Sequence, residues 1–213
     1  MRFQTTSWSL VFAAEESPEA LNELCARYWV PVFAYLRRSG FERADAEDLT
    51  QAFFGRLLEH RDFSRADPQR GKFRSFVLGA LKHFVSNARD RAQAQKRGGD
   101  VVHVAIDDET EDALTPDQVF ARRWALAVLD GALGRLREAG EPEHLLPFLT
   151  GEPSYADVAA ERNTTEGALR VAVHRLRRRF REQLRRDVAE TMDDPGGVDD
   201  EIRFLIAAVS AQP

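Results

Sequence analysis

The pattern of apolar residues predicts helices along almost the whole chain. Apolar side chains recur every three or four residues, and no segment shows the two-residue alternation of a half-buried strand. The most regular stretch follows the turn at residues 67–71, where one helix face carries an unbroken apolar series. The series consists of Phe73, Phe76, Val77, Ala80, Leu81, Phe84, Val85 and Ala88. We therefore expect an all-α fold.

Local signals mark where the first helices begin. Ser17, followed by a proline and a glutamate, predicts a capped helix start, and Pro31 is expected to kink the helix that follows. A second helix is expected to open at Asp45, because carboxylates in a first turn are stabilised by the positive end of the helix dipole.

A short helix, a tight turn and a long basic helix follow one another later in the chain. Residues 154–162 begin with a serine that can cap a helix of about two turns, and Asn163 tolerates the left-handed conformation that a tight turn requires. Thr164 or Thr165 can then cap a helix over about residues 166–192. This order is typical of a helix-turn-helix, whose second helix lies in the major groove of DNA.

The helices fall into two groups. Gly98 and Gly99 end the first group, and the acidic stretch that follows has few large apolar residues, which is typical of a linker. A chain of 213 residues is long enough for one or two domains, and we expect two small helical ones. The expected units are the domain 1–97, an acidic flexible linker 98–118, the domain 119–190, and a C-terminal extension with a short amphipathic helix, 191–213.

The net charge of −5 hides a strong segregation of sign. Residues 70–97 carry eight bases against one acid, and residues 170–186 carry eight bases against one acid. Acidic runs at residues 107–117 and 187–201 are expected to act as tethers between and after these patches. A single basic run is usually a solvated helix face, but two patches, one in each unit, favour a nucleic-acid partner.

Composition excludes several classes of protein. The longest apolar runs are far shorter than the roughly 20 residues that cross a bilayer, so we expect a soluble protein without membrane insertion. The N-terminal segment does not resemble a cleavable signal, which predicts a cytoplasmic protein. Cys25 is the single cysteine and the histidines lack metal-ligand spacing, so no metal, cofactor or catalytic site is expected.

Two motif blocks resemble the extracytoplasmic-function (ECF) subfamily of the sigma-70 family of RNA polymerase sigma factors. Residues 45–54 and 71–76, with the helix that follows them, are similar to sigma region two. Residues 154–159, 165–170 and 174–177 resemble sigma region four, and the two blocks occur in the family's order with a linker between them.

Three further segments narrow this resemblance. Residues 8–10, 95–99 and 194–209 look like a subset of the family that is common in planctomycete-type genomes, here with a short C-terminal extension.

The resemblance implies a sigma factor that binds core bacterial RNA polymerase and directs promoter-specific initiation. The acidic helix around Asp48 would dock on the polymerase clamp. The polymerase-binding residues that the resemblance implies are Asp45, Glu47, Asp48, Gln51 and Phe54. An anti-sigma factor or another regulator is the further partner that the family would imply.

By the same resemblance, region two recognises and melts the minus-ten element of promoter DNA. Holding an unstacked base of the non-template strand requires aromatic or cationic surfaces, with basic groups on the phosphates. His83 stands where the family usually has an asparagine, and Phe76 where it often has a tryptophan. The implied minus-ten residues are Lys72, Phe73, Arg74, Phe76, Lys82, His83 and Asn87.

Region four would read the minus-thirty-five element with the first turns of its second helix, which face the base edges. Val171 suits contact with a thymine methyl group. The implied minus-thirty-five residues are Thr165, Glu166, Arg170, Val171, His174, Arg175 and Arg178.

Two alternatives remain open at this point. The chain could be a dimeric helix-turn-helix regulator that does not act through core polymerase, although such a protein has no use for the long acidic linker or the clamp-like helix. The C-terminal helix, with apolar residues at 202, 205, 206 and 209, could be an ordinary packing helix or could tune access of polymerase to a sigma domain.

Overall fold

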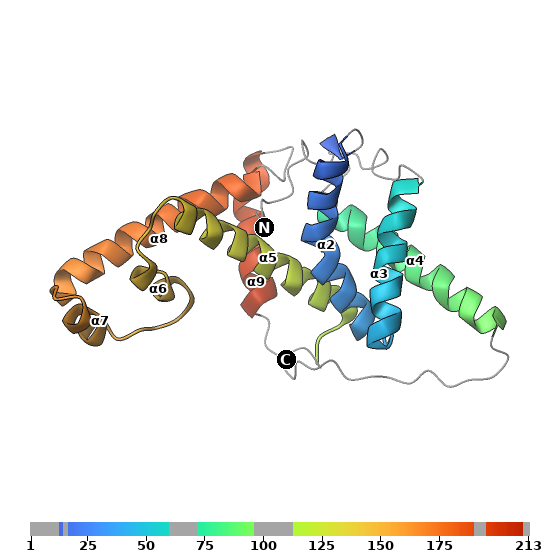
Figure 1. The fold of residues 1–213 in the computed structure, drawn as a ribbon, viewed down its shortest axis with the longest axis horizontal. Coiled ribbons are helices and arrows are strands. Elements are labelled where there is room, and N and C mark those ends of the chain that lie inside the picture. Colours follow the sequence, from blue (N-terminus) through green and yellow to red (C-terminus); the bar gives the residue numbers. More distant parts are fainter. Residues whose placement is uncertain (1–12, 15–16, 60–71, 96–112, 190–194, 211–213) are drawn as a thin grey trace.

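The computed structural model describes residues 13–14, 17–59, 72–95, 113–189 and 195–210, which form helices joined by short turns, with no strand among them (Figure 1). The all-α prediction is therefore confirmed for this part of the chain. None of the helices described is both long enough and apolar enough to cross a membrane.

Three long helices come first: α2 (Pro18–Arg38), α3 (Arg43–Glu59) and α4 (Phe73–Gln95). The predicted cap of α2 is confirmed, because the Ser17 hydroxyl accepts a hydrogen bond from the Ala20 backbone N–H at 3.2 Å. The helix continues through Pro31, which is buried, and ends before Gly40, whose φ of 93° allows the chain to turn toward α3.

The second half begins with α5, and its start corrects one predicted boundary. Thr115 and Gln118 form a capping box, in which each side chain accepts a hydrogen bond from the other residue's backbone N–H. The helix therefore starts at Pro116, inside the predicted linker 98–118, of which residues 98–112 lie outside the described part. The elements that follow are α5 (Pro116–Glu138), η4 (Glu143–Leu145), α6 (Pro147–Thr150), α7 (Tyr155–Glu161), α8 (Glu166–Ala189), η5 (Pro195–Gly197) and α9 (Val198–Ser210).

The predicted short helix, turn and long helix are present as α7 and α8. Ser154 caps α7 by accepting a hydrogen bond from the Asp157 backbone N–H at 3.2 Å, and Asn163 has the left-handed φ of 49°. Thr165 then caps α8, because its hydroxyl accepts from the Ala168 backbone N–H at 3.2 Å. Residues 190–192, predicted to end this helix, lie outside the described part.

Helices from both sides of the predicted linker contribute to the largest apolar core. Its fully buried side chains include Phe53 of α3, Leu81 of α4, Phe120 of α5 and Leu205 of α9. Each such side chain contributes about 1.5 to 3 kcal/mol by leaving water. Helix α5 contacts α2, α8 and α9, so it joins the N-terminal helix α2 to the two last long helices of the described chain (Figure 1).

A second, smaller core orients the helix-turn-helix. It contains Leu136 of α5, the segment around Phe148, and three residues of α8, Leu169, Val173 and Leu176. These three lie on one face of α8, so the opposite face of the same turns points to solvent. Figure 1 shows α6 and α7 at the far end of α8 from α3 and α4.

The C-terminal helix α9 is amphipathic, as predicted, and it packs firmly. Leu205 is fully buried and Val198 is nearly so, against α5 and α8. Two acids of the run 187–201 are also buried, Asp187 on α8 and Glu201 on α9. At these two positions the acidic run is part of the packed fold, and each carboxylate is paired with an arginine.

Candidate nucleic-acid interface

The acidic face predicted to bind polymerase lies on the outside of α3. Asp45, Glu47, Asp48 and Gln51 are exposed, while Phe54 is only 6% exposed. The Phe54 ring stacks on Trp29 of α2, with centroids 6.0 Å apart and planes 14° apart.

The indole of Trp29 is 38% exposed, and the next residue, Val30, is 52% exposed. Phe54 thus supports an apolar surface on α2 that sequence reasoning missed. Both residues fall within a long apolar run, which does not reveal which members stay outside the core.

The seven residues predicted for the minus-ten element fall into three structural groups. Phe73 is 3% exposed and meets the Tyr28 ring edge-on at 5.4 Å, so it is a core residue at the start of α4. The three cations are each paired with a carboxylate from the second half of the chain. The pairs are Lys72 with Glu201, Arg74 with Glu201, and Lys82 with Asp117.

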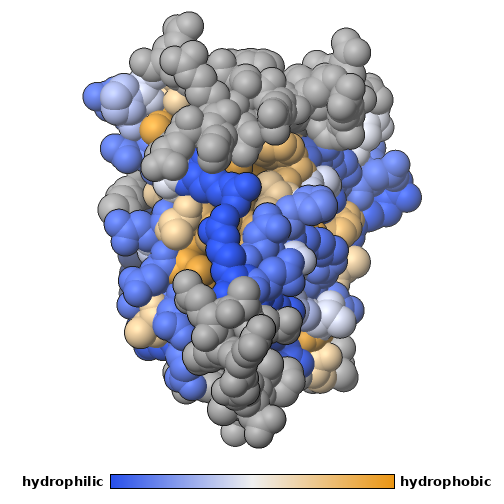
Figure 2. Space-filling model, turned by 90° about the vertical axis from the view of Figure 1, so that its right-hand side faces the viewer, coloured by the Kyte–Doolittle hydropathy of each residue, from blue (hydrophilic) through white to orange (hydrophobic). Residues whose placement is uncertain are grey.

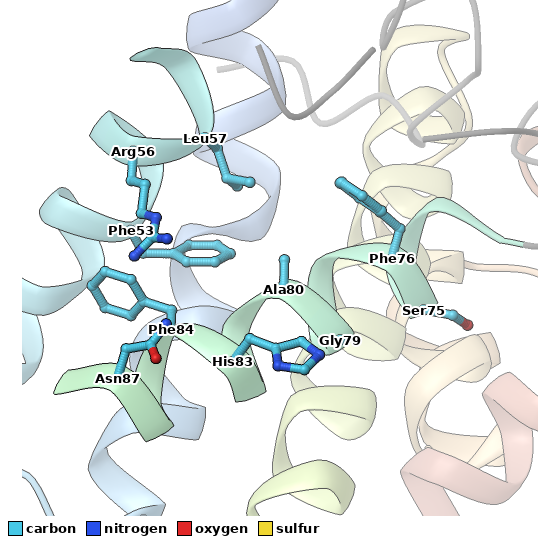
Figure 3. A pocket seen from close by; sticks show the side chains of 10 residues that line it. All are labelled: Phe53, Arg56, Leu57, Ser75, Phe76, Gly79, Ala80, His83, Phe84 and Asn87. Carbon is cyan, nitrogen blue, oxygen red and sulfur yellow. The ribbon is translucent and has the colours of Figure 1, made fainter. Parts of the chain in front are cut away.

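The third group lies in a groove between α3 and α4 with a volume of about 430 Å³ (Figure 3). Phe76, His83 and Asn87 all line it, so the groove brings together three of the residues predicted for the minus-ten element. Its complete lining is Phe53, Arg56, Leu57, Ser75, Phe76, Gly79, Ala80, His83, Phe84 and Asn87.

The floor of this groove is aromatic and its rim is polar. Phe53 and Phe84 meet edge-to-face with centroids 5.6 Å apart, and Figure 3 shows Phe76 reaching over the opposite end of the groove from α4. Gly79 leaves open space where a side chain would stand. Figure 2, which looks onto the side where α3 and α4 lie, shows hydrophobic surface exposed between hydrophilic side chains. Such a groove can accept a flat aromatic ring and offer it hydrogen bonds.

Sequence reasoning missed Arg56 at the rim of the groove. Its guanidinium comes from α3, whereas the predicted minus-ten residues all come from α4 or, for Lys72, from the position just before it. The signal available was its position three residues after Phe53, which places both side chains on neighbouring parts of one helix surface.

The residues predicted for the minus-thirty-five element lie together on the exposed side of the first half of α8. Thr165 caps the helix, and Glu166 accepts a hydrogen bond from the Arg170 guanidinium at 3.4 Å. The same guanidinium lies over the Tyr155 ring of α7, 4.4 Å from its centroid. The remaining exposed members are Val171, His174, Arg175 and Arg178. This face presents cations, a hydroxyl and an apolar side chain in adjacent turns.

Two carboxylates beside the cations predicted for the minus-ten element change the electrostatics of that region. Burial alone would raise the pKa of Glu201, but hydrogen bonds from Arg74 and Lys72 outweigh it and the pKa is lowered. The hydrogen bond to Asp117 raises the pKa of Lys82. Glu201 had a detectable signal, since it lies four residues before Leu205 and hence on the apolar face of its helix.

In the described part of the chain, no three His, Cys, Asp or Glu side chains gather closely enough to hold a metal ion. Comparison with family models, with curated proteins and with solved structures finds no match to the chain.

Proposed function

We propose that the chain is an ECF-type sigma factor, which binds core bacterial RNA polymerase and directs initiation at promoters with defined minus-ten and minus-thirty-five elements. The observation that carries this proposal is the groove between α3 and α4. A helix-turn-helix is common to many regulators, but a dimeric repressor has no need for an aromatic groove that fits an unstacked base. The proposal places the protein in the cytoplasm and assigns it no catalytic step.

In the minus-ten step, one base of the non-template strand leaves the duplex and enters the groove. Stacking on an aromatic side chain contributes about 1 to 3 kcal/mol per base, which offsets the cost of unstacking it. Phe76 supplies the ring, and the polar rim formed by His83, Asn87 and Arg56 supplies hydrogen-bonding groups for the base edge or the adjacent phosphate.

In the minus-thirty-five step, the first turns of α8 enter the major groove. Arg170 can give two hydrogen bonds to a guanine, and the exposed Val171 can contact a thymine methyl group. In the free protein Arg170 rests on Tyr155 and Glu166, so binding exchanges these contacts for contacts to DNA. Arg178, two turns further along α8, is suited to a phosphate.

When this chain is bound to polymerase, weak DNA contacts by each of its reading elements are sufficient for promoter binding. A protein with a net charge of −5 has little nonspecific attraction for DNA. When two reading elements are held on one large partner, the second contact becomes effectively intramolecular and gains from a high local concentration. We therefore retain the division into two DNA-reading units joined through residues 98–112 as part of the proposal.

The docking surface on polymerase is the outer face of α3. Its carboxylates, centred on Asp48, are exposed and accessible to a basic partner, and the apolar side chains of Trp29 and Val30 lie close by on α2. An acidic rim beside an exposed aromatic residue is a common composition for a specific protein interface.

A pull-down of core polymerase tests this surface. Asp48→Lys should abolish binding because it places a positive charge in the centre of the acidic face, while a circular dichroism melt should show the fold intact. Asp130→Lys, the same charge reversal at an exposed position of α5, is the matched control and should bind normally. Equal binding by both variants would contradict the docking assignment.

A further inference from the structure

The C-terminal helix places a buried carboxylate on two of the cations assigned to the minus-ten element. Glu201 is 1% exposed, and its Oε1 and Oε2 accept hydrogen bonds from Arg74 Nε at 2.7 Å and Nη2 at 3.2 Å. The ammonium group of Lys72 donates to the same carboxylate. A planar carboxylate held by an arginine fork has the geometry with which arginine also binds a phosphate.

The guanidinium of Arg74 is enclosed on more than one side by this arrangement. The Phe204 ring of α9 lies 3.8 Å from its central carbon, and the Trp124 ring of α5 lies 5.1 Å from it. Arg74 is left 15% exposed and Lys72 32% exposed. A DNA strand cannot reach Arg74 while α9 is in place.

Helix α9 is anchored to the second half of the molecule as well. Arg185 of α8 pairs with Asp199 in the first turn of α9, and Leu205 is buried against the shared core. The third minus-ten cation, Lys82, is paired with Asp117 in the first turn of α5. All three cations are thus paired with acids from the second half, and two of them share the carboxylate of Glu201.

We propose that α9 is an internal competitor for promoter DNA, in which Glu201 occupies the phosphate-binding positions of Lys72 and Arg74 until the promoter strand displaces the helix. This inference rests on the proposed function, because it takes Lys72 and Arg74 to hold phosphates of the minus-ten strand. The ion-pair part of the contact can be exchanged at little net cost, because a buried ion pair adds little net stability and a phosphate can replace the carboxylate on the same donors. The burial of Leu205 opposes displacement, so we expect the displaced state to be a minor one in the free protein.

The expected effect follows from the fraction of molecules that are open. If the displaced state is a minor one, populated to about 10% or less, the apparent affinity for DNA is reduced at least about tenfold. Removing the charge of Glu201 should raise the apparent affinity for DNA by the same factor. The contact between Glu201 and the two cations therefore inhibits DNA binding by the free protein, and we call this inhibition the brake. It keeps the chain from binding single strands when polymerase is absent.

Single-stranded DNA binding by the full chain tests the brake. The probe is a fluorescein-labelled oligothymidine of about 20 nucleotides, long enough for one such surface. Glu201→Gln preserves the shape of the side chain and should raise the affinity at least about tenfold. Asp200→Asn is the control. It removes the exposed carboxylate next to Glu201 in the sequence, which pairs with Arg203, and it should leave the affinity for DNA unchanged.

Hydrogen exchange of the wild-type chain gives a readout that does not depend on the stability of the variant. Amides of residues 198–210 should exchange faster when the oligothymidine is bound than when it is absent. Unchanged protection of α9 together with equal affinities for Glu201→Gln and Asp200→Asn would overturn the proposal.

Polymerase binding separates failure of the brake from failure of the proposed function. If wild type supports transcription but Glu201→Gln has no tighter DNA binding, the sigma assignment stands and the brake is wrong. If Glu201→Gln binds DNA more tightly and α9 is released, yet the wild-type chain does not bind polymerase, α9 competes with single-stranded DNA but the sigma assignment is wrong.

Discussion

Arg135 of α5 and Asp187 of α8 form a buried ion pair that joins the two longest helices of the second half. Asp187 Oδ2 accepts from Arg135 Nη2 at 2.6 Å and Nε at 3.1 Å, and Oδ1 accepts from Gln183 Nε2 at 2.6 Å. The Asp187 side chain is 2% exposed. The pair fixes the C-terminal half of α8 on α5, while the N-terminal turns of α8 project the predicted reading face.

We predict that Asp187→Ala destabilises the protein by about 3 kcal/mol, because it leaves a largely buried guanidinium without this carboxylate. Glu182→Ala, which removes an exposed acid paired with Arg178 on the same helix, should cost less than about 1 kcal/mol. Urea unfolding of both variants measures the difference. Equal midpoints would show that the Arg135 pair does not hold α8.

Acid should weaken the Glu201 contact. The pKa of this carboxyl is lowered in the folded state, so its stabilisation is fully present above its unfolded pKa of about 4.3 and is lost as pH falls through the folded pKa. The free energy of unfolding of wild type should therefore exceed that of Glu201→Gln above about pH 5, and the two should converge toward pH 3. A gap that stays constant over this range would contradict the lowered pKa.

Phe76→Leu should impair promoter melting and leave polymerase binding intact. The substitution keeps an apolar side chain but removes the ring, and loss of one stacked base costs about 1 to 3 kcal/mol. A fluorescent base analogue in the minus-ten element reports the opened fraction. Phe41→Leu, the same change at a half-buried position outside the groove, is the control and should open promoters like wild type.

Arg170→Ala should relax specificity at one promoter position. Loss of a good base contact costs about 1 to 3 kcal/mol there, whereas Arg178→Ala should weaken binding to every sequence alike and lower the salt dependence by about one phosphate contact. Affinities for a set of single-base promoter variants separate these outcomes. Uniform weakening by Arg170→Ala would mean that it touches phosphate.

Local signals in the sequence were sufficient to predict much of the fold. The caps at Ser17 and Ser154 and the left-handed Asn163 depend on residues within one turn, so short-range patterns reveal them. The start of α5 was placed too late, because the capping box at Thr115 lies at the end of an acidic stretch that resembles a linker.

Long-range pairing explains what could not be predicted. Glu201 and Arg74 are 127 residues apart, and Asp187 and Arg135 are 52 apart, so no periodicity within one helix connects them. In the sequence, both acids are simply members of the acidic run 187–201. Phe54 and Phe73 each belong to an apolar face that the sequence reveals. Which residues of such a face are buried depends on contacts with other helices, here with α2.

Transcription in vitro from a pooled promoter library, with purified protein and core bacterial polymerase, tests the central claim most directly. The account predicts discrete start sites that share two upstream elements and that disappear with Asp48→Lys but persist with Asp130→Lys. Binding of the protein to palindromic DNA, with no start site that depends on it, would contradict the account and favour a dimeric regulator.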